Sequence, residues 1–262
     1  KILMKIKKEN AGLSIDTTHS SNLSALFSSF GGKFHIGFSN PGTGIRNKIY
    51  DKATPLNSKR HMVFNYLDLF ELAGSEYEEK KIKLIKLSYS KEEENSIKGK
   101  LKNKKKLVAI HAVSEPLYKR WPEENFVKLI KFISSKGYTS VFIGSPSEKK
   151  LVQELVKKLD KKTLRKVVNL SGNTDTKELF ALMKRLSAFV GIDGGPMHIA
   201  SSMDVPSLGL FSKAPEDPVL GLFGTEDRLR YYPFNKKSSI LYKDDIKRLE
   251  FPEVKKVLGK ML

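Results

Sequence analysis

The chain contains no cysteine among its 262 residues. Disulfide bonds and thiolate-bound metal ions are therefore excluded, and the composition fits a reducing compartment without requiring one. Long apolar runs are also missing, because no stretch approaches the ~20 residues that a membrane-spanning helix needs. The first residues lack the basic, apolar and small-residue segments of a secretory signal. We therefore expect a cytoplasmic protein with one large or two modest domains.

Acidic residues are in deficit: 29 Asp and Glu stand against 48 Lys and Arg, which gives a formal net charge of +19. Such a charge is typical of nucleic-acid-binding proteins, of proteins attracted to an anionic membrane, and of proteins whose surface is merely rich in lysine. The lysines are spread along the chain, with no arginine-rich helix, RNA-binding aromatic signature or zinc-finger spacing. We favour a solvated lysine-rich surface, expect no nucleic-acid partner, and keep peripheral contact with an anionic membrane as an alternative.

From residue 107 onward, short apolar segments alternate with amphipathic ones. This alternation is typical of a parallel sheet covered by helices on both faces. One helix is expected between Pro122 and Gly137, because proline favours the first helical turn and glycine the end of a helix. We therefore predict an α/β fold with a doubly wound, Rossmann-like domain. Its expected strands are residues 107–112, 138–144, 166–172, 188–192 and 205–211, and two further helices are expected at residues 147–159 and 175–187.

The first hundred residues show the same pattern less completely. Strands are expected at residues 12–16 and 34–38, and helices at residues 21–32 and 60–74. Because these elements make up only part of a Rossmann-like domain, we expect the N-terminal domain to be incomplete.

A stretch dense in Lys and Glu, residues 75–106, separates the two patterns and ends in a lysine run. Such composition is typical of a solvated linker. We therefore predict one domain over residues 1–104 and a second over residues 105–262.

The stretch "VGIDGGPMHIA", residues 190–200, follows a buried strand of the second domain. In an open parallel sheet, ligands bind in the crevice outside the carboxyl ends of the strands. Gly194 and Gly195 let the backbone approach a ligand closely, and Pro196 begins a helix whose free N–H groups face it. The stretch therefore predicts an anion site, most naturally for a phosphate.

Two polar side chains accompany this turn. Asp193 would repel a phosphate, so we expect it to accept hydrogen bonds from a sugar hydroxyl. His198 can donate to a phosphate oxygen when protonated or to a hydroxyl when neutral. Glycine-rich turns between strand and helix are common, so this turn alone is weak evidence. An equivalent junction, "HAVSEPLYKRWP", places Ser114 and Lys119 toward the same crevice, and a lysine and a hydroxyl there suit a diphosphate.

These segments carry a resemblance. "HAVSEPLYKRWPEENFVKLIKFISSKGYTSVFIGSPSE" followed by "GIDGGPMHIASSMDVPSLGLF" strongly resembles the bacterial heptosyltransferase family. Members of that family are GT-B glycosyltransferases, in which two Rossmann-like domains face a cleft and heptose passes from ADP-heptose to the inner core of lipopolysaccharide. The resemblance runs from about residue 10 to the end and is looser in the N-terminal part.

The resemblance implies a site for a nucleotide-diphospho-sugar, with neither cofactor nor metal ion, since the sequence has no Asp-x-Asp motif. Trp121 is expected in the core, and Glu148 also suits the first turn of a helix. The family usually carries Ser or Thr at the position of Gly194, so one hydroxyl contact is absent here. The implied contacts are Ser114 and Lys119 on the diphosphate, Glu148 near the ribose, Thr174 near the nucleotide, Asp193 on hydroxyls of the transferred sugar, and Gly194, Gly195 and His198 at the phosphate end.

One expected feature of the family is absent from this sequence. The family normally begins with a strand and a Gly-Asp turn, and that Asp is the expected general base of an inverting transfer. "KILMKI" looks like such a strand, but "KKENAG" follows it. Asp16, at the end of an expected strand, is the only local substitute. The basic loop after residue 38 suits a lipid-linked or phosphorylated saccharide acceptor.

Three functions follow from these observations. The leading hypothesis is a heptosyltransferase at the cytoplasmic face of a membrane, which transfers heptose or a related sugar with inversion. The second is a nucleotide-sugar-binding homologue with lost or weak catalysis, because the Gly-Asp turn is absent. The third is a nucleic-acid-binding Rossmann-like protein, motivated only by charge.

Overall fold

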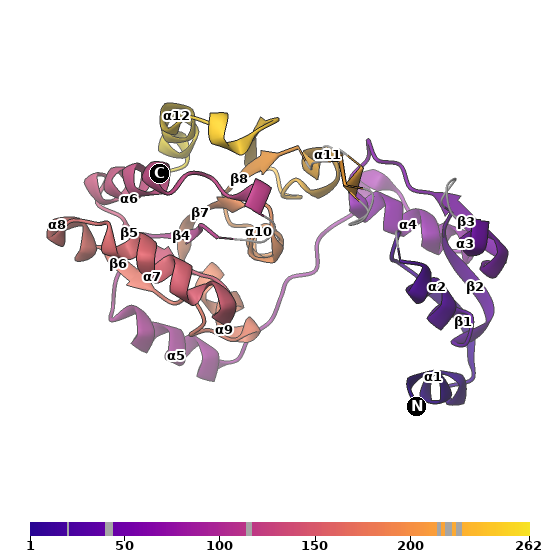
Figure 1. The fold of residues 1–262 in the computed structure, drawn as a ribbon. Helices are drawn as coiled ribbons and strands as arrows, with labels where there is room; N and C mark the ends of the chain where they lie inside the picture. The colour runs from indigo at the N-terminus through magenta and orange to yellow at the C-terminus, as the bar shows by residue number, and fades with distance from the viewer. Residues whose placement is uncertain (20, 40–43, 114–116, 214–215, 218–221, 224–226) are drawn as a thin grey trace. The chain divides into compact units, whose positions relative to one another are not determined.

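The computed structural model covers residues 1–262 and describes all of them except 20, 40–43, 114–116, 214–215, 218–221 and 224–226 (Figure 1). The chain divides into two compact units. The first contains Lys1–Lys83 with Asp217–Leu222, and the second contains Leu84–Glu216 with Phe223–Leu262. No helix in the described part of the chain is long and apolar enough to cross a membrane.

The first unit is built on a three-stranded parallel sheet with strand order β1-β2-β3. Both predicted strands and both predicted helices are present. The small core of the unit contains Ile36, Phe38 and Leu69. The elements are β1 (Ala11–Asp16), α2 (Asn22–Ser28), β2 (Gly32–Ser39), α3 (Gly44–Ile49), β3 (Lys52–Pro55), α4 (Met62–Leu72) and a 3-10 turn, η1 (Glu79–Lys81).

The expectation of a strand in "KILMKI" is wrong, because this segment forms helix α1 (Ile2–Lys8). Leucine, methionine and lysine favour helix, and Ile2 and Ile6 stand four residues apart on one helical face. No residue of α1 is buried. Its conformation therefore follows local propensity rather than pairing with the sheet.

The second unit contains six parallel strands in the order β11-β8-β7-β4-β5-β6. All five predicted strands are confirmed. The sixth, β11, was not predicted because its short segment is only partly buried at the edge of the sheet. The strands are β4 (Leu107–His111), β5 (Thr139–Phe142), β6 (Val167–Asn169), β7 (Leu186–Ile192), β8 (Ser207–Ser212) and β11 (Ser239–Lys243).

Helices cover both faces of this sheet, and Figure 1 shows α6 and α12 on one face with α5 and α9 on the other. Along β4, Val108 and Ile110 pack into one hydrophobic cluster while Leu107 and Ala109 pack into the other. The alternation explains why the strand is apolar throughout. The helices are α5 (Lys91–Leu101), α6 (Glu123–Ser135), α7 (Lys149–Lys157), α8 (Lys161–Leu164), α9 (Thr176–Met183), α10 (Gly195–Ser202), α11 (Asp227–Tyr231) and α12 (Phe251–Met261).

Several short elements complete the fold. Three 3-10 turns are η2 (Leu117–Lys119), η3 (Pro146–Glu148) and η4 (Ile246–Arg248). Two further strands, β9 (Glu216–Asp217) and β10 (Leu222–Phe223), pair with each other. Trp121 is buried, as predicted, and its indole N–H donates to the carbonyl of Leu249 at 2.7 Å.

The division between the units falls at residue 83, ahead of the predicted boundary at residue 104. The Lys- and Glu-rich stretch contains α5, whose Ile97 and Leu101 are fully buried in the second unit. Lys100 and Ser96 on the same helix hydrogen bond to Glu178 of α9. Charged composition concealed an amphipathic helix here, because the two buried positions are few among many exposed charges.

Candidate active site

The strand order of the second unit defines a crevice. The chain passes from β4 outward to β5 and β6, then returns to β7 on the other side of β4 and continues to β8 and β11. The order therefore reverses between β4 and β7, and in open α/β sheets ligands bind at the carboxyl ends of strands at such a point. The segments after His111 and after Ile192, which the sequence singled out, both begin there.

Lys119 and Asp193 come together at this point. The ammonium Nζ of Lys119, in η2, donates to Oδ2 of Asp193 at 2.5 Å. Both side chains are mostly buried, with 18% of Lys119 and 10% of Asp193 exposed. The structure thus joins two predicted site residues that are far apart in the sequence. A cation and a carboxylate side by side can receive a phosphate and a hydroxyl, respectively.

His198 lies in the first turns of α10 and belongs to the same electrostatic cluster. Burial lowers the pKa of His198 below its usual value; the Asp193 carboxylate opposes this shift and the Lys119 charge adds to it. Its ring lies edge-on to that of Tyr231, with 6.4 Å between the centroids. The imidazole is therefore neutral near pH 7 and can donate a hydrogen bond without carrying charge.

The glycines at the start of α10 have different surroundings. Gly194 is the N-cap of the helix, and its φ of 176° is extended backbone that any residue adopts. A Cβ at this position would lie 3.1 Å from Cε1 of His111, so a side chain here would require the ring to shift by a few tenths of an ångström. A Cβ at Gly195 would meet nothing within 4 Å. Pro196 has no N–H, and the N–H of Met197 donates to the carbonyl of Gly194 at 3.1 Å, so the backbone N–H of Gly195 is the group at the start of α10 suited to an anion.

Glu148 follows β5 and faces the end of β4. Its Oε1 lies 3.7 Å from Nε2 of His111, and its Oε2 accepts from the backbone N–H of Ser145 at 2.6 Å. Burial alone would raise the pKa of Glu148, but the hydrogen bonds from His111 and Ser145 outweigh it and hold the pKa below its usual value. Glu148 is therefore an ionised carboxylate at the strand ends, as its predicted role near a ribose requires.

Thr174, another predicted contact, follows the edge strand β6 and not β4 or β7. Thr174 is half-buried in the turn between β6 and α9, just before Asp175, which caps α9 by accepting from Glu178 N–H at 2.8 Å. Lys100 donates to the carbonyl of Asn173 at 2.8 Å and so holds this turn against α5. Ser114 lies outside the residues that the structure describes.

Asp16, the candidate general base, is buried in the first unit and fully engaged. Its carboxylate accepts from Thr18 N–H, Thr18 Oγ1, Ser24 Oγ and Tyr50 OH at 2.6 to 2.9 Å, and Arg46 lies 3.4 Å away. Burial alone would raise the pKa of Asp16, but these hydrogen bonds together hold it below its usual value. A carboxylate with a lowered pKa and occupied lone pairs is a poor proton acceptor.

The arginine that follows the basic loop predicted to meet the acceptor has a structural role. Arg46 of α3 is completely buried. Its guanidinium donates to the backbone carbonyls of Thr18, Ser21 and Phe38. Arg46 therefore holds the loop after β1 to the end of β2, and it does not present its charge to an acceptor.

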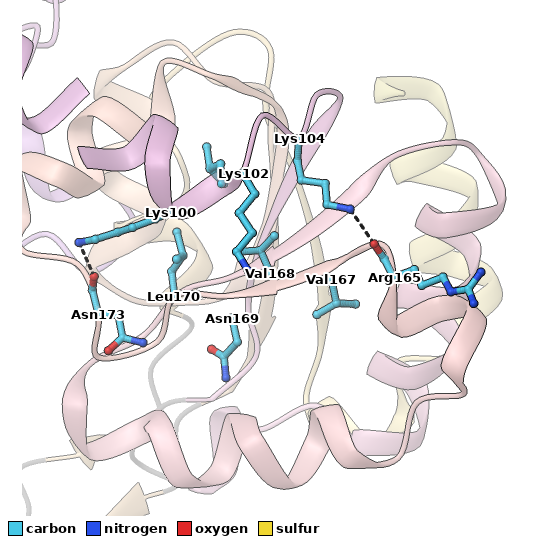
Figure 2. Close-up of a pocket in the computed structure, with 10 residues that line it drawn as sticks. Lys100, Lys102, Lys104, Arg165, Val167, Val168, Asn169, Leu170 and Asn173 are labelled. Atoms are coloured by element: carbon cyan, nitrogen blue, oxygen red, sulfur yellow. Dashed lines mark hydrogen bonds between the residues drawn. The ribbon is translucent and has the colours of Figure 1, made fainter. Parts of the chain in front are cut away.

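A groove of about 800 Å³ lies beside the edge strand β6 (Figure 2). Lys100 donates to the carbonyl of Asn173 at one end of the groove, and Lys104 donates to that of Arg165 at 2.8 Å at the other. Lysines beside an edge strand prevent it from pairing with other chains. We interpret this groove as protection of the sheet edge. Its lining residues are Lys100, Leu101, Lys102, Lys104, Arg165, Val167, Val168, Asn169, Leu170 and Asn173.

Comparison with known proteins identifies the family of the chain. A family model described as glycosyltransferase family 9 (heptosyltransferase) matches residues 1–217. The chain belongs to this family. Among the described residues, no group of three or more His, Cys, Asp or Glu side chains is placed to hold a metal ion.

Relatives within family 9 are lipopolysaccharide and lipooligosaccharide heptosyltransferases. Lipooligosaccharide heptosyltransferase 2 of Haemophilus influenzae is 31% identical over 93 residues, which are 36% of this chain and 27% of that protein. Lipopolysaccharide heptosyltransferase 3 of Escherichia coli is 29% identical over 130 residues, 49% of this chain and 36% of that protein. The lipopolysaccharide core heptosyltransferase OpsX of H. influenzae is 23% identical over 273 residues, 99% of this chain and 72% of that protein. The matched regions thus span about a third of the first two relatives and most of the third.

Solved structures of family 9 proteins share the fold. The ADP-heptose lipopolysaccharide heptosyltransferase II of E. coli superposes with a TM-score of 0.72 at 19% identity, covering 99% of this chain and 78% of that chain. The family 9 protein of Veillonella parvula superposes with a TM-score of 0.77 at 19% identity, covering 99% and 76%. The predicted α/β fold of the heptosyltransferase type is therefore confirmed.

Sequence analysis of this family 9 chain missed one residue at the crevice, His111. Its imidazole lies at the end of β4, next to both Glu148 and Gly194. The available signal was its place as the last residue of a strand that is buried throughout, where a titratable side chain is unusual.

Proposed function

We propose that this family 9 chain is a glycosyltransferase that uses a nucleotide-diphospho-sugar, specifically ADP-heptose, as the donor. The sugar passes with inversion to a lipid-linked saccharide of the lipopolysaccharide core, at the cytoplasmic face of the membrane. The observation that carries the proposal is the cluster of Lys119, Asp193 and His198 at the point where the strand order reverses, beside the start of α10.

The charges of this cluster fit the steps of such a transfer. When the sugar leaves, negative charge develops on the diphosphate, and Lys119 with the N–H group of Gly195 stabilises it. As Lys119 turns to the diphosphate, Asp193 gives up its present partner and accepts hydrogen bonds from hydroxyls of the sugar. Neutral His198 donates to a phosphate oxygen or hydroxyl beside them.

Two features bear on the acceptor side of the proposed transfer, namely the surroundings of Asp16 and the net charge of the chain. Asp16 takes no part as the general base, because its carboxylate is saturated by donors from Thr18, Ser24 and Tyr50. The net charge of +19 supports peripheral attraction to an anionic membrane, where a lipid-linked acceptor resides.

Calorimetric titration with ADP and with ADP-heptose tests the donor site. Lys119→Met is expected to weaken the binding of both ligands by about 10- to 100-fold, since charge-assisted hydrogen bonds to the diphosphate are lost. Asp193→Asn is expected to weaken ADP-heptose but not ADP, because a carboxylate near the phosphates contributes only repulsion to ADP. Lys158→Met is the matched control, because that exposed lysine after α7 pairs with Glu123 outside the cluster.

A product assay with lipopolysaccharide core acceptor completes the test. Product formed from ADP-heptose supports the transferase. Donor binding without product would favour a nucleotide-sugar-binding homologue instead. If the unaltered chain binds neither nucleotide, and binds DNA or RNA with a steep salt dependence, the donor proposal is wrong.

A further inference from the structure

His111 has a buried hydrogen-bonding atom without a partner. The residue is 4% exposed, and its Nε2 faces Glu148 Oε1 at 3.7 Å. In the described part of the chain, Nδ1 of the same ring is covered and accepts or donates no hydrogen bond. Leaving such an atom unpaired is unfavourable, so folded proteins rarely keep one without a reason.

Two glycines of the neighbouring strand and turn make room for this ring. Gly191 pairs with His111 in the sheet, and a Cβ there would lie 2.8 Å from Cβ of His111. A Cβ at Gly194 would lie 3.1 Å from Cε1 and 3.5 Å from Nδ1. Because the backbone of Gly194 is extended, its conformation does not require glycine. The glycine instead leaves room for the ring, because a Cβ there would press against Cε1.

Glu148 faces one of the two nitrogens of the His111 ring. Glu148 is ionised and accepts hydrogen bonds, so it favours a proton on Nε2 of His111. In a neutral imidazole with its proton on Nε2, Nδ1 is an acceptor. In that form, the unpartnered Nδ1 can accept a hydrogen bond from an O–H or N–H group. The atom lies at the strand ends, beside the cluster of Lys119, Asp193 and His198.

We propose that Nδ1 of His111 accepts a hydrogen bond from the nucleotide-sugar donor, with Glu148 orienting the ring and Gly194 giving the ligand access to it. The inference rests on the proposed function, since it assigns a further binding residue to the same site. The partner group is a hydroxyl of the transferred sugar or an O–H or N–H group of the nucleotide.

Two substitutions of His111 separate its two nitrogens. Asparagine places its amide oxygen near the position of Nδ1 and does not reach Glu148, whereas glutamine reaches toward Glu148 and lacks the Nδ1 acceptor. We expect His111→Gln to weaken ADP-heptose binding about 10-fold, the effect of one lost hydrogen bond that leaves a ligand donor unpaired. His111→Asn should retain most of the affinity. Calorimetry measures both, and the thermal midpoint of each variant shows that it is folded.

The ligand used in the titration identifies the partner group. A loss in His111→Gln that appears with ADP as well as ADP-heptose assigns the partner to the nucleotide, and a loss confined to ADP-heptose assigns it to the sugar. Equal losses in both His111 variants, or a larger loss in His111→Asn, would overturn the inference. If the unaltered protein binds ADP-heptose and neither variant changes the affinity, the inference fails while the proposed function stands.

A glycine substitution tests access to Nδ1 independently. Gly194→Ala places a methyl group against the imidazole, so we expect weaker ADP-heptose binding. Gly99→Ala in α5 is the matched control, because a Cβ there meets nothing within 4 Å and Gly99 is exposed outside the site. Unchanged affinity in Gly194→Ala would contradict the proposed approach of the ligand.

Discussion

Asp16 and Asp193 occupy similar places in the two units, and their surroundings differ. Each stands at the carboxyl end of a parallel strand, each is mostly buried, and each lies near a cationic side chain. Asp16 accepts from three neutral side chains and a backbone N–H besides its contact with Arg46. Asp193 has an ion pair with Lys119 at a reversal of strand order. A strand-end carboxylate is thus a candidate for chemistry only when its lone pairs remain available to a ligand.

The largest expected difference between the two carboxylates is in stability. Asp16→Ala leaves the fully buried Arg46 without its counter-charge, and breaking a buried pair in this way costs about 3 to 5 kcal/mol. Asp193→Ala should cost less, because Lys119 retains some exposure and its ammonium can turn to water, whereas Arg46 is completely buried.

Urea unfolding can assign that loss to one unit. Trp121 is the only tryptophan and is buried in the second unit, so its fluorescence reports that unit, while far-UV circular dichroism reports both. We expect Asp16→Ala to add an early circular-dichroism transition and leave the Trp121 transition in place. A Trp121 transition that moves equally would show that the Asp16 network stabilises the whole chain.

A smaller effect is expected from the tyrosine partner of Asp16. Tyr50 OH donates to Asp16 Oδ2 at 2.6 Å, and its ring lies over Gly37, where any Cβ would clash with it. Tyr50→Phe retains the packing and removes one hydrogen bond to a charged group, which is worth about 1.5 to 3 kcal/mol. The early circular-dichroism transition should shift by less than in Asp16→Ala. A shift as large as that of Asp16→Ala would mean that the hydrogen bond from Tyr50 accounts for the whole stabilising effect of the carboxylate, and that its pairing with Arg46 adds nothing.

Much of the second unit could be predicted from the sequence because its local and global signals agree. Pro122 and Gly137 bracket a helix whose Phe126 and Ile130 are buried, and each apolar run became a strand. The meeting of Lys119 and Asp193 could also be predicted, because carboxyl ends of parallel strands share one edge of the sheet.

The failures had physical causes that the sequence does not display. The sequence suggested Asp16 as a base and the loop after residue 38 as an acceptor surface, but Asp16 and Arg46 are buried and hydrogen bonded to each other across 30 residues. The fit of Gly194 against His111 likewise depends on a tertiary contact that no local pattern encodes. Contacts that depend on burial, and not on a shared edge of the sheet, were therefore least accessible to sequence analysis.

The smallest expected effect uses pH to separate the two units further. Burial lowers the pKa of His198, so the unfolded chain takes up a proton more readily than the folded chain. The contribution of His198 to stability is therefore fully present above its ordinary pKa of 6.5, and it is lost as the pH falls through the folded pKa. Asp16 has the same sign at lower pH, since its stabilisation is complete above 3.8 and is lost as the pH falls through its lowered folded pKa. Between pH 6.5 and 4, we therefore expect the Trp121 transition in urea to shift downward and His198→Gln to reduce that shift, while the contribution of Asp16 to the first unit stays constant. A Trp121 transition with the same pH dependence in His198→Gln would show that another group of the second unit carries it.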